Sequence, residues 1–161
     1  MFSALEARDA IDSARVVDLY AGSGALGLEA LSRGANSVVL VEQSPAAAAV
    51  AKTNAKVVTE AIDLPAEQVR VVTEPVNTFL ASAPDASADL VLIDPPYELS
   101  ATELNEQLSQ IARMCTRDAI VVIERSDRSE APAWPECFSQ FGEKHYGDTV
   151  VWWARANTEL D

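Results

Sequence analysis

The sequence predicts an α/β domain built on a largely parallel sheet and finished by an antiparallel hairpin. Two observations predict this class. Short apolar runs alternate with longer segments of helical periodicity, which is the pattern of strands joined by crossover helices. The last two strand candidates are joined only by Gly147-Asp148, and so short a turn requires a hairpin. Because the chain has 161 residues and a domain averages roughly 150, we expect one domain over residues 1–161.

The first half of the chain is predicted to hold three strands and two helices. The strands are expected at residues 15–19, 37–41 and 69–72, and the helices at residues 25–33 and 45–58. Gly34 ends the first helix, because glycine readily adopts the left-handed conformation of a helix C-terminus. Ser44 and Pro45 have the order of an N-cap followed by proline in the first helical position.

The second half is predicted to complete a seven-stranded sheet with helices on both faces. Strands are expected at residues 89–93, 119–123, 138–146 and 149–155, a helix at 102–114, and a surface loop at 126–135. Leu104, Leu108 and Ile111 lie at helical spacing on one face of that helix. The strands at 138–146 and 149–155 form the antiparallel edge.

Composition excludes several classes of protein. Hydrophobic residues make up 48% of the chain and charged residues 23%, values that are ordinary for globular proteins. No uncharged apolar stretch approaches the roughly 18 residues of a membrane span. The N-terminus lacks the basic and apolar segments of a signal peptide, so we expect a cytoplasmic protein that does not contact membranes.

Metal-ligating and nucleophilic side chains are few. Cys115, Cys137 and His145 are too few for a disulfide framework or a four-ligand zinc site, so we expect no metal. A nucleophilic Cys–His pair stays open, although no motif supports it.

The charge balance argues against nucleic acid as a ligand. Twelve Lys and Arg residues against 25 Asp and Glu residues give a formal net charge of −13. Because non-specific affinity for nucleic acid comes mainly from cations that neutralise phosphates, a strongly acidic chain is expected to bind it weakly.

A glycine turn follows the first strand and opens the first helix. Gly22 to Gly27 match G-x-G-x-x-G in the context that a nucleotide-binding turn requires, and Glu42 ends the second strand 20 residues after Gly22. A carboxylate there can accept both hydroxyl hydrogens of an adenosine ribose. The pattern predicts an adenosine-containing cofactor and fits both NAD and S-adenosylmethionine. Asp18 favours S-adenosylmethionine, because its carboxylate suits the ammonium of a methionine moiety and would repel the pyrophosphate of NAD.

A second motif, Asp94-Pro95-Pro96-Tyr97, ends the strand at 89–93. The prolines fix the backbone and leave free carbonyl acceptors. An exocyclic amine could donate one hydrogen to the Asp94 carboxylate and another to the Pro95 carbonyl, which directs its lone pair at an electrophilic methyl group. Tyr97 offers an aromatic face for a planar base. A nicotinamide-dependent oxidoreductase would explain the glycine turn but leaves this tetrapeptide without a function.

Together these motifs resemble the class I S-adenosylmethionine-dependent amino-methyltransferases, and more narrowly the bacterial enzymes that modify a guanine N2 in 16S ribosomal RNA. The resemblance rests on residues 18–24, Glu42 and residues 94–97, with further similarity at residues 25–35, 122–126 and 146–149. It covers nearly the whole chain. It implies a Rossmann-like class I methyltransferase fold, S-adenosylmethionine as cofactor, and 16S rRNA or the small ribosomal subunit as partner.

The resemblance also implies site residues. The cofactor would be held by Asp18, Tyr20, Ala21, Gly22, Ser23, Gly24, Glu42, Gln43, Glu74 and Val76. The catalytic segment would be Asp94, Pro95, Pro96 and Tyr97, and substrate contacts would come from Tyr97, Arg125, Arg128 and Lys144. Methyl transfer would be a direct in-line displacement, and the target base would have to be splayed out of its stack first.

The sequence departs from this family in three places. Members usually carry an Arg- and Gly-rich arm and an Arg-Pro-Thr segment before the first helix, whereas this sequence begins inside that helix. Pro75 stands where the family tends to have an Asp that can accept a bond from the adenine amine, and Glu74 could substitute for it. The net charge requires local cations, and we expect Arg125, Arg128 and Lys144 to form a small basic rim.

The residues alone are also compatible with other functions. The acceptor could instead be a DNA adenine, a protein amide or a small amine. The acidic composition mildly favours an acceptor that is not a nucleic acid. A non-catalytic RNA-binding factor that keeps only the fold is a further alternative. We expect a monomer.

Overall fold

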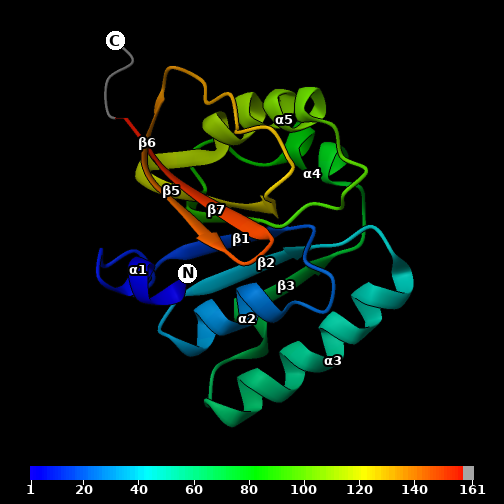
Figure 1. Ribbon diagram of the computed structural model, residues 1–161. Coiled ribbons are helices and arrows are strands. Elements are labelled where there is room, and N and C mark those ends of the chain that lie inside the picture. The colour runs from blue at the N-terminus through cyan, green and yellow to red at the C-terminus, as the bar shows by residue number, and fades with distance from the viewer. Residues whose placement is uncertain (158–161) are drawn as a thin grey trace.

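The computed structural model describes residues 1–157, so the last four residues of the expected 1–161 domain lie outside the described residues. Seven strands form one sheet in the order β3-β2-β1-β4-β5-β7-β6 (Figure 1). The strands are β1 Arg15–Leu19, β2 Ser37–Val41, β3 Val69–Val72, β4 Ala88–Ile93, β5 Cys115–Ser126, β6 Phe138–Tyr146 and β7 Thr149–Ala156. Strands β1 to β5 pair in parallel, and β7 pairs antiparallel with both β5 and β6. The predicted fold class is therefore confirmed.

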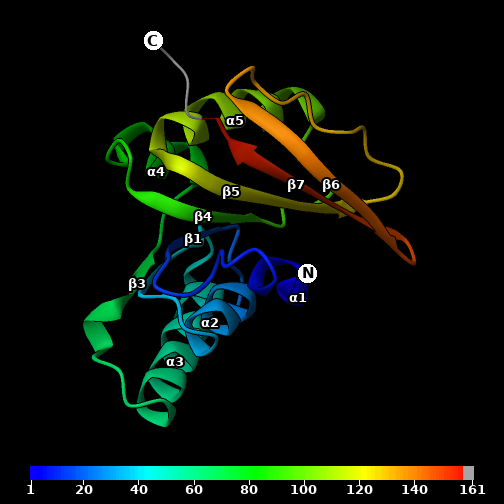
Figure 2. The ribbon, with the colours of Figure 1, turned by 90° about the vertical axis from the view of Figure 1, so that its left-hand side faces the viewer.

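Helices cover both faces of the sheet. They are α1 Phe2–Glu6, α2 Ala25–Ser32, α3 Pro45–Ala61, α4 Val76–Ser82 and α5 Ala101–Met114, with a 3₁₀ turn, η1, at Ala66–Gln68. Helices α4 and α5 lie on one face, and α1, α2 and α3 lie on the other (Figures 1 and 2). None of the helices within residues 1–157 is long and apolar enough to cross a membrane.

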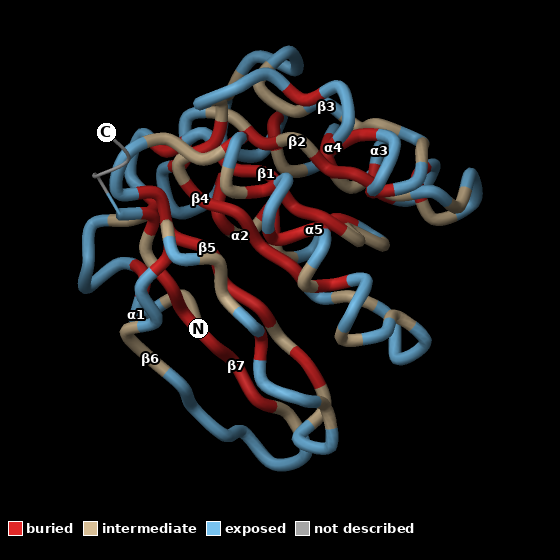
Figure 3. The backbone as a smooth tube through the Cα atoms, turned by 90° about the horizontal axis from the view of Figure 1, so that it is seen from above, coloured by how far each residue is buried: buried red, intermediate tan, exposed pale blue. Residues whose placement is uncertain are grey.

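The core consists of two apolar layers that the alternation of strand side chains separates. On β4, Val91 and Ile93 pack beneath α4 and α5, while Leu90 and Leu92 pack toward α2. The central strands are buried on both faces, as parallel strands between helices must be. The outer strand β6 is mostly exposed, and its neighbour β7 is buried (Figure 3).

Two helices begin at caps that the sequence supplies. The Ser44 hydroxyl accepts a hydrogen bond from the Ala47 amide at 3.3 Å, and Pro45 follows in the first helical position. Ser100 and Glu103 form a reciprocal capping box at the start of α5. Such caps satisfy backbone donors that have no partner within the helix.

The structure differs from the sequence prediction at α4 and β5. Helix α4 was not predicted, because seven residues hold too few apolar positions to establish a period; Val76, Phe79 and Leu80 nevertheless bury one face of it. Strand β5 begins at Cys115, four residues earlier than predicted. The polar residues Arg117 and Asp118 conceal that extension in the sequence, and Asp118 has a left-handed backbone with φ 63°.

Candidate functional site

The predicted site residues converge at the carboxyl ends of β1, β2 and β4. Leu19 pairs with Val41 on β2 and with Ile93 on β4, so the three strands end at the same edge. The glycine turn, Glu42 and the Asp94 segment follow directly from these ends. Ligands of open α/β sheets bind at this edge, where neighbouring strands turn to opposite faces.

The glycine turn alternates into the left-handed region of backbone space. Tyr20, Gly22 and Gly24 have φ values of 59°, 56° and 85°. The Gly24 amide donates to the Ala21 carbonyl at 2.8 Å, and the Ser23 carbonyl accepts from the Asn54 side-chain amide at 3.0 Å. Left-handed backbone is costly for a residue other than glycine, so Tyr20 is held there by its surroundings.

Tyr20 is held by a side-chain network that sequence reasoning missed. Its hydroxyl donates to the Gln107 carbonyl oxygen at 3.0 Å, and the Gln107 amide is 2.7 Å from the same hydroxyl and 2.9 Å from the Asn77 oxygen. Burial raises the pKa of Tyr20, which keeps the phenol neutral. Gln107 is itself buried within α5, and no sequence pattern distinguishes it from an exposed helical glutamine.

Gly27 allows helix α2 to approach β1 and β2 closely. A Cβ on Gly27 would lie 2.5 Å from Leu40 Cδ2 and 2.8 Å from Val38 Cγ1, nearer than carbon atoms can pack. The Gly27 amide donates to Asp18 Oδ2 at 2.9 Å. The first turn of α2 is thereby fixed against the end of β1.

Asp18 is buried beneath the turn with one carboxylate oxygen lacking a partner. Its exposed fraction is 1%, and its Oδ1 has no hydrogen-bond partner among residues 1–157. Burial raises the pKa of Asp18 to about 7; the Gly27 amide opposes this shift, and the charge of Asp94 adds to it. A buried oxygen without a partner favours the arrival of a donor or a cation, so the position suits an ammonium group.

Glu42 connects the glycine turn to the start of α3. Its Oε1 accepts from the Gly22 amide at 3.1 Å, and its Oε2 accepts from the Ser44 amide at 2.7 Å. Each carboxylate oxygen has a second lone pair, so these bonds fix the side chain while leaving acceptor capacity. A contact with ribose hydroxyls stays a prediction.

A cavity of about 430 Å³ lies between the ends of β1, β2 and β4. It is lined by Tyr20, Val41, Glu42, Gln43, Val76, Asp94, Pro95 and Pro96. Six of the predicted cofactor residues do not line this cavity: Asp18, Ala21, Gly22, Ser23, Gly24 and Glu74. Val41 lines it without having been predicted. We call this space the cofactor cavity.

A second cavity, of about 340 Å³, lies on the other side of the Asp94 segment. Its lining residues are Asp94, Pro95, Pro96, Tyr97, Glu124, Arg125, Ser126 and Thr149. We call it the acceptor cavity. Asp94, Pro95 and Pro96 line both cavities, so a group in one cavity meets a group in the other at this segment.

Two residues of this segment differ in their surroundings. Burial raises the pKa of Asp94, whereas Tyr97 projects outward with 85% of its surface exposed.

The three predicted basic residues differ in their surroundings. Arg125 is only 8% exposed, and its guanidinium donates to the Leu99 carbonyl at 2.7 Å. Arg128 is exposed in the loop after β5. Lys144 lies on β6, with its ammonium 4.9 Å from the centre of the Tyr146 ring. Arg125 lines the acceptor cavity and the other two do not. Their binding of RNA stays a prediction, and Arg125 differs from the exposed rim residue we expected.

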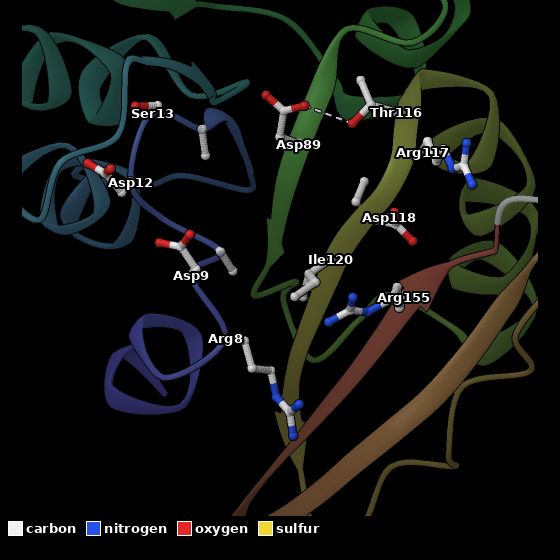
Figure 4. Close-up of a pocket in the computed structure, with 13 residues that line it drawn as sticks. Arg8, Asp9, Asp12, Ser13, Asp89, Thr116, Arg117, Asp118, Ile120 and Arg155 are labelled. Atoms are coloured by element: carbon white, nitrogen blue, oxygen red, sulfur yellow. Dashed lines mark hydrogen bonds between the residues drawn. The ribbon is translucent and has the colours of Figure 1, made fainter.

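Another hollow, of about 280 Å³, lies at the opposite edge of the sheet (Figure 4). There Asp89 accepts bonds from the Arg15 guanidinium and the Thr116 hydroxyl, and Asp9 and Arg155 also line the hollow. This hollow lies at the amino ends of the strands and is lined by both acidic and basic side chains. It contains no glycine turn and does not adjoin Asp94. It is therefore separate from the two joined cavities.

The remaining candidate groups do not form a reactive cluster. Burial raises the pKa of the Cys115 thiol to about 12, with a smaller contribution from Cys137. A thiol with so high a pKa is a poor nucleophile. No group of three or more His, Cys, Asp or Glu residues within residues 1–157 is arranged to hold a metal ion.

The sheet topology, together with the family match, the named relative and the solved structure described next, identifies this protein as a class I S-adenosylmethionine-dependent methyltransferase. The sequence profile of the family described as Conserved hypothetical protein 95 matches residues 1–155, and the chain belongs to that family.

Named relatives and solved structures agree with this assignment. The chain is 31% identical over 140 residues to Ribosomal RNA small subunit methyltransferase D of Escherichia coli, covering 87% of this chain and 67% of the relative. It is 28% identical to the Haemophilus influenzae protein of the same name, covering 85% and 69% of the two chains. The solved structure of Escherichia coli yhhF superposes with a TM-score of 0.82 at 27% identity over 98% of this chain and 84% of that one.

A more distant structure extends the agreement in fold. An RNA methyltransferase from Salinibacter ruber, solved with S-adenosyl-L-homocysteine, has a TM-score of 0.73 at 17% identity, covering 99% of this chain and 92% of that chain. At so low an identity this likeness concerns the fold.

Proposed function

We propose that this protein transfers a methyl group from S-adenosylmethionine to the exocyclic N2 of a guanine in 16S rRNA of the small ribosomal subunit. The observation that carries the proposal is the shared wall of the two cavities. Asp94, Pro95 and Pro96 line both the cofactor cavity and the acceptor cavity. A methyl donor and an amine placed on either side of them meet at one point.

The cofactor cavity suits S-adenosylmethionine. Its volume is within the range of small-molecule sites, roughly 300 to 1,000 Å³. Glu42 would accept the ribose hydroxyl hydrogens, and Gln43, Glu74 and Val76 would flank the adenine. The buried Oδ1 of Asp18 supports a place for the methionine ammonium near the turn of residues 20–24. S-adenosylmethionine supplies an electrophilic methyl group on a positively charged sulfur.

The acceptor cavity suits an exocyclic amine. The Asp94 carboxylate and the Pro95 carbonyl would each accept one hydrogen of guanine N2, so that the nitrogen lone pair faces the cofactor cavity. As the N2–methyl bond forms, the electrons of the sulfur–methyl bond stay on sulfur and one N2 proton passes to Asp94. The raised pKa of Asp94 favours that transfer. Tyr97, exposed at the rim, would stack on the splayed-out base.

Ribosomal RNA as the acceptor is supported by the relatives. The Escherichia coli and Haemophilus influenzae relatives are both named small-subunit rRNA methyltransferases. Arg128 and Lys144 would supply local cations for the rRNA backbone on an otherwise acidic chain.

A calorimetric titration tests the cofactor half of this proposal. We expect S-adenosylhomocysteine to bind saturably at one site per chain, and NADH under the same conditions to give no heat of binding. Replacing Glu42 with Gln should weaken the binding of S-adenosylhomocysteine without unfolding the protein. Binding of NADH in place of S-adenosylhomocysteine would overturn the proposal in favour of an oxidoreductase.

A further inference from the structure

Glu124 lies beside Asp94 in the sheet, one strand further from the cofactor cavity. Ile93 on β4 pairs with Ile123 on β5, so Asp94 and Glu124 follow at the same level on neighbouring parallel strands. Glu124 in turn pairs with Val151 on β7. Paired residues of adjacent strands direct their side chains to the same face, and Val151 belongs to the apolar layer on the α2 side.

The carboxylate of Glu124 is half-buried and lines the acceptor cavity. Burial raises its pKa, the charge of Asp94 adds to the shift, and the N-terminal ammonium opposes it. No hydrogen bond from residues 1–157 contributes to that shift. The carboxylate therefore keeps its acceptor capacity for a donor that enters the cavity.

Among the β5 residues that line the acceptor cavity, Glu124 is the acidic one. The guanidinium of Arg125 is turned to the other side, where it bonds to the Leu99 carbonyl. Ser126 and Thr149 bring hydroxyl groups to the cavity wall, and the Ser126 oxygen accepts from the Arg128 amide. The Ser126 hydroxyl hydrogen thus stays available as a donor. The wall offers two carboxylate acceptors and, beside them, hydroxyl donors.

This order of acceptors and donors matches one edge of guanine. Guanine presents N2–H₂ and N1–H as adjacent donors, followed by the O6 acceptor, whereas adenine has a lone pair at N1. Resting on the proposed function, we infer that Glu124 is a specificity-determining residue that accepts the N1–H of the target guanine while Asp94 accepts from N2. A base with a lone pair at N1 would face the Glu124 carboxylate without a hydrogen between them. Such unpaired polar groups in a closed site discriminate strongly.

2-Aminopurine separates this role from the transfer step, because it keeps the 2-amino group but has a lone pair at N1. The substrate is a small subunit whose 16S rRNA carries either guanosine or 2-aminopurine at the position that the wild-type protein methylates. We expect the wild-type protein to prefer guanosine by about 100-fold or more in kcat/KM. In Glu124→Gln the amide can donate to N1 of 2-aminopurine, so this preference should fall by at least about tenfold. 2-Aminopurine also lacks O6, but that difference is common to both proteins and cancels in the comparison.

Two further variants complete the test. Glu124→Ala removes the carboxylate that accepts the N1–H. It should lower kcat/KM for guanosine and thereby reduce the preference for guanosine over 2-aminopurine. Glu106→Gln makes the same charge change on the exposed face of α5 and should leave the preference as in the wild type. S-adenosylhomocysteine affinity should match the wild type in all three variants, which shows that the cofactor cavity is intact.

The outcomes distinguish the inference from the proposed function. If the wild-type protein methylates guanosine and both Glu124 variants keep its full preference over 2-aminopurine, the role of Glu124 is wrong and the proposed function stands. If the wild-type protein methylates no guanine of the small subunit, the proposed function fails and the inference fails with it.

Discussion

Three carboxylates, Asp18, Asp94 and Glu124, lie near the carboxyl ends of the adjacent strands β1, β4 and β5. Burial is the largest cause of the raised pKa of each, and the charge of Asp94 adds to the shifts of the other two. Like charges in so small a region disfavour full ionisation. A cation on the cofactor side and donor groups on the acceptor side would both relieve that repulsion. The acidity of this edge is therefore suited to the proposed ligands.

At the residue scale, the first prediction concerns Asp94. Asp94→Ala should lower kcat by about a thousandfold, a typical effect of removing one group that stabilises developing charge. Affinity for S-adenosylhomocysteine should stay within about threefold of wild type, because the other residues that line the cavity remain. Single-turnover methylation and calorimetry measure the two quantities.

The matched control for Asp94→Ala is Asp85→Ala. Asp85 is an exposed carboxylate that pairs with Arg113 away from both cavities. It should retain wild-type turnover. Methylation by Asp94→Ala at the wild-type rate would refute the role assigned to Asp94.

A second prediction at this scale concerns stability and pH. The pKa of Asp18 is about 7 in the folded protein and 3.8 for an unperturbed aspartate. Between these values the unfolded chain releases a proton that the folded protein keeps, so the stabilising contribution of Asp18 is complete below about pH 4 and is lost as pH rises through 7. Urea unfolding at several pH values measures the free energy of unfolding. As pH rises from about 4 to about 7, the free energy of unfolding of the wild type should fall relative to that of Asp18→Asn by a few kcal/mol, in order of magnitude.

Asp18→Asn is the appropriate reference because Asn can still accept the hydrogen bond from Gly27. Groups with the opposite shift, such as Asp89 with its pKa lowered beside Arg15, titrate in both proteins and cancel in the difference. A difference in stability that does not vary with pH between 4 and 8 would contradict the buried acid described for Asp18.

At the element scale, close packing of α2 on the sheet yields a third prediction. Gly27→Ala should destabilise the fold by about 1–3 kcal/mol, because its Cβ would collide with Leu40 and Val38. Ser32→Ala, on the exposed side of the same helix, should change stability by less than about 0.5 kcal/mol. Thermal or urea unfolding compares the two. Equal stability of Gly27→Ala and wild type would show that the helix can move away from the sheet at little cost.

The bond from Arg125 to Leu99 connects β5 with the segment that follows Asp94, and it gives a fourth prediction. Arg125→Met should lower kcat by about tenfold or more, because the segment is no longer held in position. The slope of log affinity for RNA against log salt should stay unchanged, since a guanidinium used internally neutralises no phosphate. A slope reduced by about one would instead indicate that Arg125 contacts a phosphate. That result would support the sequence-based expectation that Arg125 belongs to the basic rim.

The success of the sequence prediction varied between elements for physical reasons. Strands such as Ser37–Val41 were located to the residue, because their apolar runs end at polar or glycine residues. The ends of parallel strands share an edge, so the meeting of Gly22, Glu42 and Asp94 followed from the order of elements. Helix α4 and the first four residues of β5 were missed, because tertiary packing and not local periodicity determines them.

Within the site, the sequence located the segments but not the detailed contacts. Glu42 and Asp94 could be identified because their spacing from recognisable motifs is fixed. Gln107 and Glu124 could not, because each reaches the site through strand register or helix packing that no local pattern encodes. The burial of Arg125 was missed for the same reason.

At the scale of the whole molecule, a net charge of −13 must be reconciled with an RNA substrate. Few cations can contact phosphates, so we expect RNA affinity to depend only weakly on salt, with a slope of about 2–3 on the logarithmic scale. Arg128→Ala and Lys144→Ala should each reduce the slope by about one. Filter binding from 50 to 200 mM salt would measure it. Slopes unchanged in both variants would place the RNA elsewhere on the surface.

The most direct test of the account is methyl transfer to small ribosomal subunits that lack the modification. The protein is incubated with these subunits and S-adenosylmethionine, and the rRNA nucleosides are analysed by mass spectrometry. We expect N2-methylguanosine at one position, approaching one methyl group per subunit, and formation about a thousandfold slower with Asp94→Ala. Methylation of a different atom, or no methylation by a chain that binds S-adenosylhomocysteine, would contradict the assignment of the acceptor cavity to guanine N2.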